Sequence, residues 1–154
     1  MLDEPTFRAL YAEHTPALHL LALRLTGNRS DADDAVQETW IRVARKPEPL
    51  RAATSPRGWL CGILINCCRE QRRAQVLRVD APAPVDPTHG MRVDLETAVR
   101  SLPNGFREVL VLHDVEGHTH EEIARLLGIE GSTSRSQLAR ARERLRRNLE
   151  GYRD

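Results

Sequence analysis

Apolar residues recur at intervals of three and four along most of the chain, and the alternation of β-branched and polar residues that marks strands is absent. This is the period of amphipathic helices that bury one side. In the N-terminal part it predicts a short helix at residues 7–11 and, after Thr15-Pro16, a second helix that stops at Gly27-Asn28. The expected fold class is all-α.

Two further helices are predicted before residue 78. Ser30 offers an N-cap with Asp33 three residues later, and the helix that follows ends before Pro47. Ser55 and Pro56 combine an N-cap with a proline at the first helical position, and they open a helix that runs toward residue 73. The buried stripes of these two helices are Val36, Trp40, Val43 and Ala44, and then Trp59, Leu60, Ile63, Leu64 and Cys67.

Residues 79–92 interrupt the helical pattern. They hold three prolines and a glycine and have no apolar period, so neither a helix nor a central strand is expected there. We therefore expect two small helical domains, residues 1–78 and residues 93–154, joined by a flexible Pro-rich linker.

The helix boundaries are sharper after the linker. Amphipathic segments at residues 95–102 and 106–112 are separated by Pro103-Asn104-Gly105, and the second ends near Gly117. Residues 119–122, Thr-His-Glu-Glu, then form a capping box in front of a short apolar helix.

The last two predicted helices are typical of a helix-turn-helix. Gly128 closes the short capped helix, a tight turn follows, and a longer basic helix begins at Ser132 or Thr133. In such a unit the start of the second helix lies in the major groove, and small polar side chains there let the backbone approach the DNA closely. The alternative is a solvated arginine-rich helix that packs through the apolar stripe Leu138, Ala141, Leu145 and Leu149.

The 154 residues, at 17.4 kDa, suffice for one ordinary domain or two very small ones. With 40% hydrophobic and 29% charged residues the chain has the composition of a globular protein, and because aromatic residues make up only 4% its core must be aliphatic. No apolar run approaches the ~18–20 residues of a membrane helix, and the chain starts with acidic residues where a signal peptide would be basic. We expect a cytoplasmic protein without membrane insertion.

The net charge of +1 conceals a strong pattern along the chain. Residues 1–56 carry −1, residues 57–78 carry +4, residues 79–131 carry −6, and residues 132–154 carry +4. Two short basic blocks separated by acidic ones indicate two separate contacts with a polyanion. The basic residues are 22 arginines and the single Lys46, which suits phosphates and guanine edges but is also what a GC-rich genome would produce.

Catalytic and metal-binding motifs are missing from the sequence. The three cysteines, Cys61, Cys67 and Cys68, form no CxxC pair, so we interpret them as structural thiols rather than a redox switch. The six histidines do not fall at metal-ligand spacings with them. A glycine-rich phosphate loop, HExxH and GxSxG are also absent, and the sequence therefore predicts no cofactor, no metal and no enzymatic activity.

Residues 117–142 resemble the promoter-reading domain of the extracytoplasmic-function sigma factors of bacterial RNA polymerase. Residues 31–40, Asp-Ala-Asp-Asp-Ala-Val-Gln-Glu-Thr-Trp, are similar to that family's polymerase-binding helix. The family's promoter-opening helix is similar to the segment of this chain that contains Trp59-Leu60, Asn66, Glu70, Arg72 and Arg73. Members commonly carry other residues at four positions: glycine at Ser132, valine at Ser134, arginine at Gln137 and aspartate at Glu70. These departures concern the promoter sequence that is read, not the role.

The resemblance implies a transcription initiation factor with core RNA polymerase, promoter DNA and an anti-sigma factor as partners. Asp34, Gln37 and Glu38 lie at i, i+3 and i+4 on one face of their helix and would bind the polymerase, although a merely solvated acidic face has the same pattern. The proximal promoter element would be contacted by Asn66, Arg69, Arg72 and Arg73, and the distal element by Thr133, Ser134, Arg135, Ser136, Gln137 and Arg140.

Other functions fit the sequence less well. A sigma-like decoy that captures a regulatory partner without binding DNA would have lost the basic residues, whereas both basic blocks are present. A simple helix-turn-helix repressor would leave the first domain and the linker without a role. Trp59 could stack on DNA, but its place on the apolar stripe with Leu60 and Ile63 favours a core position.

Overall fold

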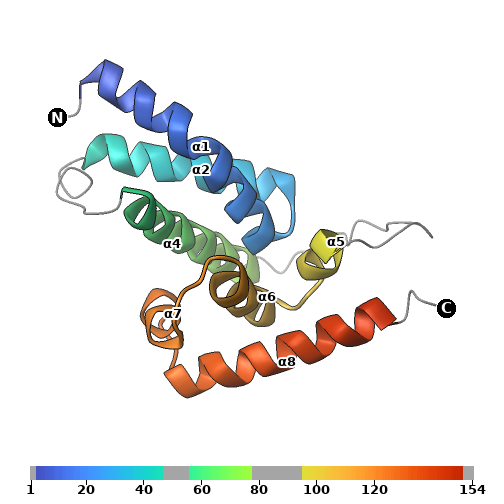
Figure 1. Cartoon of the computed structure of the whole chain (residues 1–154). Coiled ribbons are helices and arrows are strands. Elements are labelled where there is room, and N and C mark those ends of the chain that lie inside the picture. Colours follow the sequence, from blue (N-terminus) through green and yellow to red (C-terminus); the bar gives the residue numbers. More distant parts are fainter. Residues whose placement is uncertain (1–2, 47–55, 78–94, 151–154) are drawn as a thin grey trace. The chain divides into compact units, whose positions relative to one another are not determined.

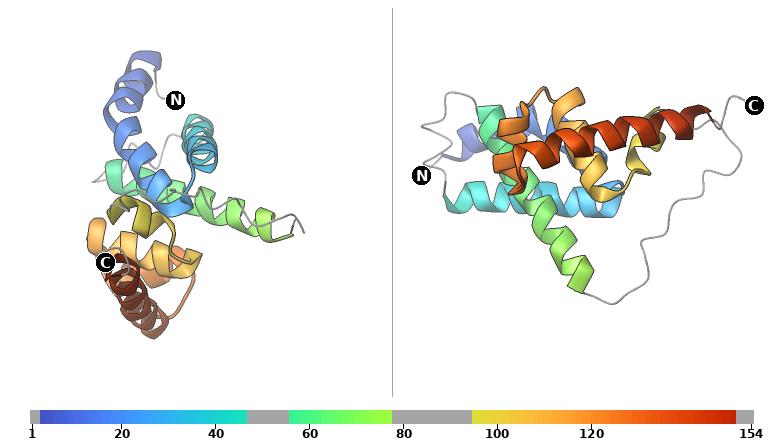
Figure 2. Two further views of the ribbon diagram at one scale, coloured as in Figure 1. Left: turned by 90° about the vertical axis from the view of Figure 1, so that its right-hand side faces the viewer. Right: turned by 90° about the horizontal axis from the view of Figure 1, so that it is seen from below.

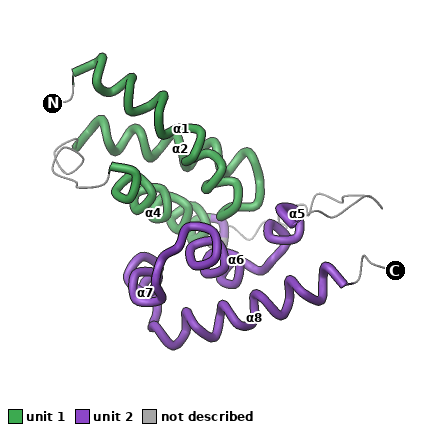
Figure 3. Tube along the Cα trace, in the orientation of Figure 1, with its two compact units in different colours: residues 1–74 green, residues 75–154 purple. Residues whose placement is uncertain are grey.

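The computed structural model describes residues 3–46, 56–77 and 95–150, and all regular structure within these ranges is helical (Figure 1). The all-α prediction is confirmed. The chain divides into two compact units, residues 1–74 and residues 75–154 (Figure 3). The predicted linker, residues 79–92, lies outside the described residues.

The first unit is built from three helices, α1 (Glu4–Thr26), α2 (Arg29–Arg45) and α4 (Pro56–Leu77), the last of which extends just beyond the unit boundary. α1 and α2 run side by side in opposite directions, and α4 crosses them at an angle (Figure 2). The buried apolar residues include Leu18, Leu21 and Leu25 of α1, Val36, Trp40 and Val43 of α2, and Leu60, Leu64 and Ile65 of α4.

α1 is one continuous helix, so the prediction of two short helices on either side of Pro16 is wrong. A proline inside a helix removes one backbone hydrogen bond and crowds the preceding turn. The turns that follow Pro16 bury Leu18, Leu21 and Leu25, and this packing outweighs the local preference for a break. The helix ends as predicted at Gly27, whose φ of 83° is the left-handed conformation that glycine adopts without strain.

The start of α2 also differs from the prediction. Its N-cap is Asn28 rather than Ser30, and the Asn28 side chain accepts a 2.8 Å hydrogen bond from the backbone N–H of Asp31. Two residues therefore connect α1 to α2. α4 begins at Pro56 as predicted, while its predicted cap Ser55 lies outside the described residues.

The second unit contains α5 (Leu95–Arg100), α6 (Asn104–Leu110), the π-helical turn η1 (Val111–Val115), α7 (His120–Leu127) and α8 (Gly131–Glu150). α8 packs against α5, α6 and α7, and its buried residues are Ser134, Leu138 and Ala141. Within the described part of this unit, α8 is thus the helix on which the others are assembled (Figure 1).

The turn between α5 and α6 is held by a buried arginine. The Arg107 guanidinium donates hydrogen bonds to the backbone carbonyls of Arg100 and Leu102, at 3.2 and 3.0 Å, and to Asn104 Oδ1 at 2.7 Å. These bonds satisfy carbonyls that the end of α5 leaves free. The sequence predicted that the second segment would begin at residue 106, but α6 begins at Asn104, directly after Pro103.

No helix in the described ranges is long and apolar enough to cross a bilayer. The same residues hold no cluster of three or more histidine, cysteine or acidic side chains that could bind a metal ion.

Candidate functional site

The helix-turn-helix predicted from the sequence is present in α7 and α8. Thr119 Oγ1 accepts a 3.1 Å hydrogen bond from the backbone N–H of Glu122, and the Glu122 carboxylate accepts one from the backbone N–H of Thr119, so the capping box is confirmed. Gly128 ends α7 with a φ of 67°. Because local hydrogen bonds fix both ends of α7, the turn that follows it sets the direction in which α8 begins.

α8 presents a polar, basic surface near its start. Arg135, Ser136 and Arg140 are exposed, and Thr133 is half-buried. Arg144 and Arg147 follow Arg140 at intervals of four and three, so they lie on the same side of the helix and are also exposed. The arrangement can hold phosphates along one side of α8 and place short polar groups at its N-terminal end.

Two of the predicted distal-element residues do not lie on that surface. Ser134 is fully buried, and its Oγ lies 2.8 Å from His120 Nδ1. Gln137 is half-buried and packs on α6, where a Cβ at Gly105 would lie only 3.1 Å from Gln137 Oε1. Both placements argue against a direct DNA contact. The signal for Ser134 was present in the sequence, because it precedes Leu138 by four residues on the buried stripe.

Arg142 is occupied by a contact within the second unit. Its Nε and Nη2 donate hydrogen bonds of 3.0 and 2.7 Å to the carboxylate of Asp114. This pairing raises the pKa of Arg142 and lowers the pKa of Asp114 below its usual value. This bidentate ion pair connects α8 to η1. The contact was not predicted from the sequence.

In the first unit, the predicted docking residues of α2 differ in exposure. Asp34 and Gln37 are exposed, whereas Glu38 is half-buried and accepts a 3.2 Å hydrogen bond from Arg42 Nε. Ile41 lies four residues after Gln37, on the same side of α2, and is exposed as well. The face is therefore mixed, with acidic and amide groups beside an apolar one.

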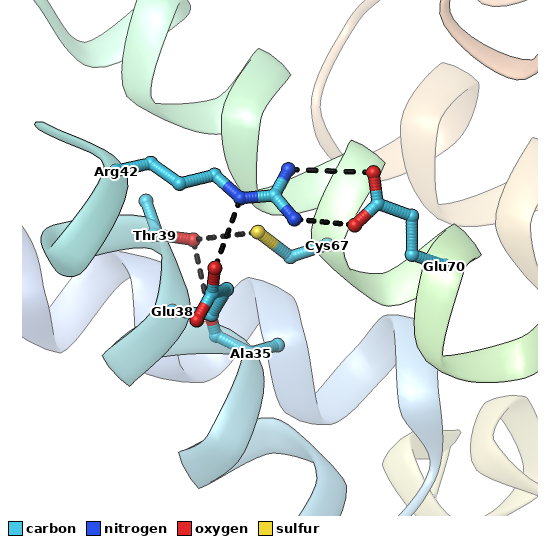
Figure 4. A network of polar contacts seen from close by, with 6 residues as sticks. All are labelled: Ala35, Glu38, Thr39, Arg42, Cys67 and Glu70. Atoms are coloured by element: carbon cyan, nitrogen blue, oxygen red, sulfur yellow. Dashed lines mark hydrogen bonds and ion pairs between the residues drawn. The ribbon is translucent and has the colours of Figure 1, made fainter. Parts of the chain in front are cut away.

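A polar network anchors this face to α4 (Figure 4). The Arg42 guanidinium donates two hydrogen bonds to the Glu70 carboxylate, which raises the pKa of Arg42. Behind it, Thr39 Oγ1 donates to the backbone carbonyl of Ala35 at 2.8 Å and lies 3.7 Å from Cys67 Sγ. Burial raises the pKa of the Cys67 thiol, which keeps it protonated and unreactive near neutral pH. This supports the interpretation of Cys67 as a structural thiol.

An open groove between α1 and α2 was not predicted from the sequence. Its volume is about 570 Å³. Trp40 lines it, and its ring contacts the rings of Phe7 and Tyr11, at centroid distances of 5.6 and 5.2 Å. Gln37, one of the predicted docking residues, and the exposed Ile41 line it as well. The sequence held only an indirect signal for this groove. Aromatic residues are scarce in the chain, and three of them line it.

The predicted proximal-element residues lie on the second half of α4. Asn66 and Arg73 are exposed, and Arg69 and Arg72 are half-buried. Trp59 is half-buried, not fully in the core, and it precedes Asn66 by two helical turns on the same side. One helix thus carries an amide, an aromatic ring and several arginines. Such a combination can bind both phosphates and an unstacked base.

Both parts of the chain are similar to known proteins. Residues 10–77 match the family model for sigma-70 region 2, and residues 92–145 match the one for sigma-70 region 4. The sigma factor SigE of Mycolicibacterium smegmatis is 37% identical over 92% of this chain, which spans 61% of that protein's length. SigM of Mycobacterium tuberculosis is 35% identical over 97% of this chain and 80% of its own. Both are named as extracytoplasmic-function sigma factors of RNA polymerase.

Solved structures show the same fold. The sigma factor RpoE of Bartonella quintana, in complex with the anti-sigma factor NepR, superimposes with a TM-score of 0.70 at 25% identity, covering 94% of this chain and 96% of that one. CnrH, in complex with the cytosolic domain of CnrY, gives a TM-score of 0.62 at 25% identity, with 97% and 90% of the two chains covered.

Proposed function

Since this chain belongs to the extracytoplasmic-function sigma factors of the sigma-70 family, we propose that it directs promoter-specific transcription initiation. In this role it binds core RNA polymerase, recognises two promoter elements and helps to open the DNA. The observation that carries the proposal is a capped helix-turn-helix with an exposed basic helix, on a chain whose other unit carries a mixed acidic and apolar face.

The two promoter contacts are assigned to different domains. Residues 1–78 would bind core polymerase and the proximal element, residues 79–92 would link the domains, and residues 93–154 would bind the distal element. The two family regions and the two basic blocks support this division, because the block at residues 57–78 falls in the first proposed domain and the block at residues 132–154 in the second.

For the distal element, the exposed start of α8 supports contacts by Thr133, Arg135, Ser136 and Arg140. Arginine can form two hydrogen bonds with the major-groove edge of guanine, and hydroxyl groups suit either bases or phosphates. Ser134 and Gln137 are left out of this set because of their burial.

For the proximal element, Asn66 would bind a base that leaves the stack, and Arg69, Arg72 and Arg73 would hold the neighbouring phosphates. An amide can hydrogen-bond to the Watson–Crick edge of a flipped base, and its energy must help to offset a few kcal/mol of unstacking. The exposure of Asn66, two turns from the half-buried Trp59, supports this role.

Core polymerase would bind the α2 face that contains Asp34, Gln37 and Glu38. The Arg42–Glu70 and Arg42–Glu38 contacts support this because they hold the face rigidly on α4 before any partner arrives. The aromatic groove next to Gln37 would add apolar area to the same contact.

We also propose an anti-sigma protein as a partner, since RpoE, which shares this fold, was solved with the anti-sigma factor NepR bound, and CnrH with the cytosolic domain of CnrY bound. The polymerase would carry out all catalysis, so this chain is not itself an enzyme. It would act in the cytoplasm, where polymerase and chromosome are found. The decoy function has no support, because Arg135, Arg140 and Arg144 of α8 are exposed, although Arg142 of the same helix is paired with Asp114.

The decisive experiment is transcription in vitro with purified core polymerase of the source bacterium on a library of randomised promoters. The expected result is enrichment of templates that share two short elements at a fixed separation, only when this chain is added. Transcription without any shared element, or none above that of core enzyme alone, would contradict the proposed function.

A further inference from the structure

A chain of polar side chains connects η1, α7 and α8 within the helix-turn-helix. The rings of His113 and His120 stack with centroids 4.6 Å apart and an interplanar angle of 19°. His120 Nδ1 lies 2.8 Å from Ser134 Oγ, and His113 Nδ1 lies 2.8 Å from Asp114 Oδ1. Asp114 in turn accepts the two hydrogen bonds of Arg142. The chain of contacts therefore starts on the first turn of α8 and returns to α8 two turns further on.

The presence of a serine at position 134 is explained neither by packing of the buried stripe alone nor by contact with DNA. It occupies a position of the buried stripe that continues with Leu138 and Ala141, where an apolar side chain would pack without any need for a partner. A buried hydroxyl without a hydrogen bond costs free energy, because burial removes its bonds to water. His120 removes this cost, and the resulting bond joins the first residue of α7 to the first turn of α8.

We propose that His120 and Ser134 are a positioning pair for the distal promoter element. Their contact fixes the rotation of the first turn of α8 about its axis, and this rotation decides where the exposed neighbours Arg135 and Ser136 meet the base edges. Promoter discrimination then depends on Ser134 although its side chain is shielded from DNA. This inference rests on the proposed function, since it concerns how the same surface reads its element.

The charges around His120 make the pair sensitive to acid. His113 and Asp114 face it from η1, and Arg135 and Arg142 face it from α8. Burial, followed by the positive charges of His113 and the two arginines, lowers the pKa of His120 below its ordinary value of about 6.5. A histidine with a lowered pKa in the folded state stabilises that state above its unfolded pKa, and this contribution is lost as the pH falls from about 6.5 through the lower folded value.

The test uses the full chain bound to core polymerase and the promoter that the unsubstituted protein selects from a randomised library. The readout is the ratio of its affinity for that promoter to its affinity for the same DNA with a scrambled distal element. Ser134→Ala removes the hydroxyl, and His120→Phe keeps the ring stacked on His113 without the hydrogen bond. Ser101→Ala is the matched control, because it removes a 2.7 Å hydroxyl bond to Ala98 elsewhere in the unit.

Ser134→Ala and His120→Phe are each expected to lower the ratio about tenfold by losing one hydrogen bond. Affinity for the scrambled DNA should stay unchanged, and the double variant should be no worse than either single one because both remove the same contact. His120→Asn, whose side chain can still bond to Ser134, should retain most of the discrimination. It should also lack the decline of this ratio below about pH 6.5 that we expect of the unsubstituted protein.

Unchanged discrimination in Ser134→Ala, or an equal loss of affinity for both DNAs, would overturn the inference. If Ser134→Ala loses helicity, the pH profile of His120→Asn decides, and a profile identical to that of the unsubstituted protein would overturn it as well. Failure of the proposed function is distinguishable, because the unsubstituted protein would then select no distal sequence in the first place.

Discussion

Asn66 is the single residue whose placement bears most directly on promoter opening. It is exposed on α4, and substitution by alanine removes an amide from the surface without touching the buried stripe. We expect Asn66→Ala to leave polymerase association and distal-element binding nearly unchanged, to depress opening, and to weaken discrimination at one proximal base. Permanganate probing of unpaired thymines, on a matched promoter and on one that is already melted, measures this.

The melted template is the control for that experiment. If Asn66 binds an unstacked base, premelting removes the cost of extruding it and should rescue part of the defect. A variant that is equally defective on both templates and in polymerase binding would show that Asn66 has a structural role only.

The exposed arginines of α8 lead to a second prediction at this scale. Arg135→Ala or Arg140→Ala should each cost about 1–3 kcal/mol of promoter binding, with altered preference at one position, if the side chain binds a base. If it binds only phosphate, the loss should be independent of sequence and the salt dependence shallower. Binding assays at several salt concentrations, with Arg142→Ala as an arginine already paired to Asp114, separate these outcomes. Unchanged binding in both variants would favour the decoy function.

At the scale of helices, the docking face of α2 can be tested without unfolding it. Replacing Asp34, Gln37 and Glu38 together by alanine should abolish co-purification with core polymerase and leave helicity intact. The reason is that the buried stripe of α2 is untouched, and Arg42 retains its partner Glu70 when Glu38 is removed. Glu13→Ala, an exposed acidic residue on α1, controls for loss of charge alone. Unchanged affinity of the triple variant for core would refute the assignment.

The clamp between α2 and α4 gives a prediction about stability. Arg42→Gln should lower the free energy of unfolding by about 1 kcal/mol, because the pair with Glu70 is well oriented but partly open to solvent and therefore screened. Thermal unfolding at low and high salt checks this, since the difference between variant and parent should shrink as salt is added. A difference independent of salt would point to lost packing of the Arg42 side chain instead.

These elements also show what the sequence could and could not predict. The capping box at Thr119 and the terminal glycines Gly27 and Gly128 were predicted correctly because each depends on residues a few positions apart. The continuity of α1 through Pro16 was missed because it depends on packing against α2, and local helix signals carry no information about such packing. The π-helical turn η1 was missed for the same reason, since nothing local distinguishes it from the end of α6.

The candidate sites follow the same rule. Residue types and faces were predictable from helical spacing, and Asn66 and Arg140 are exposed, as their proposed roles require. Hydrogen bonds between side chains were not predictable. They bear on the exposure of Ser134, which His120 holds inside the unit, and of Glu38, which Arg42 partly covers.

At the scale of the whole molecule, two compact units belong to one chain whose net charge is small. The net charge is only +1, and the basic blocks at residues 57–78 and 132–154 contribute +4 each. Binding to DNA gains most when many phosphate contacts are made at once, which requires both units to be held at the correct separation. The composition of residues 79–92 predicts an r.m.s. reach of roughly 20 Å for those 14 residues, too variable to set that separation.

The polymerase surface would then have to fix the spacing of the two units. We expect the free protein to bind promoter duplex weakly, with a Kd in or above the micromolar range typical of nonspecific contacts, and to bind far more tightly and selectively once core polymerase is added. Fluorescence anisotropy with a labelled promoter, with and without core, measures both states, and core alone serves as the control. Lengthening the linker by several Gly-Ser residues should change little in the complex, because the separation is then set by the polymerase. Tight and selective binding by the free protein, or a sharp loss on lengthening the linker, would show instead that the chain itself fixes the arrangement of its two units.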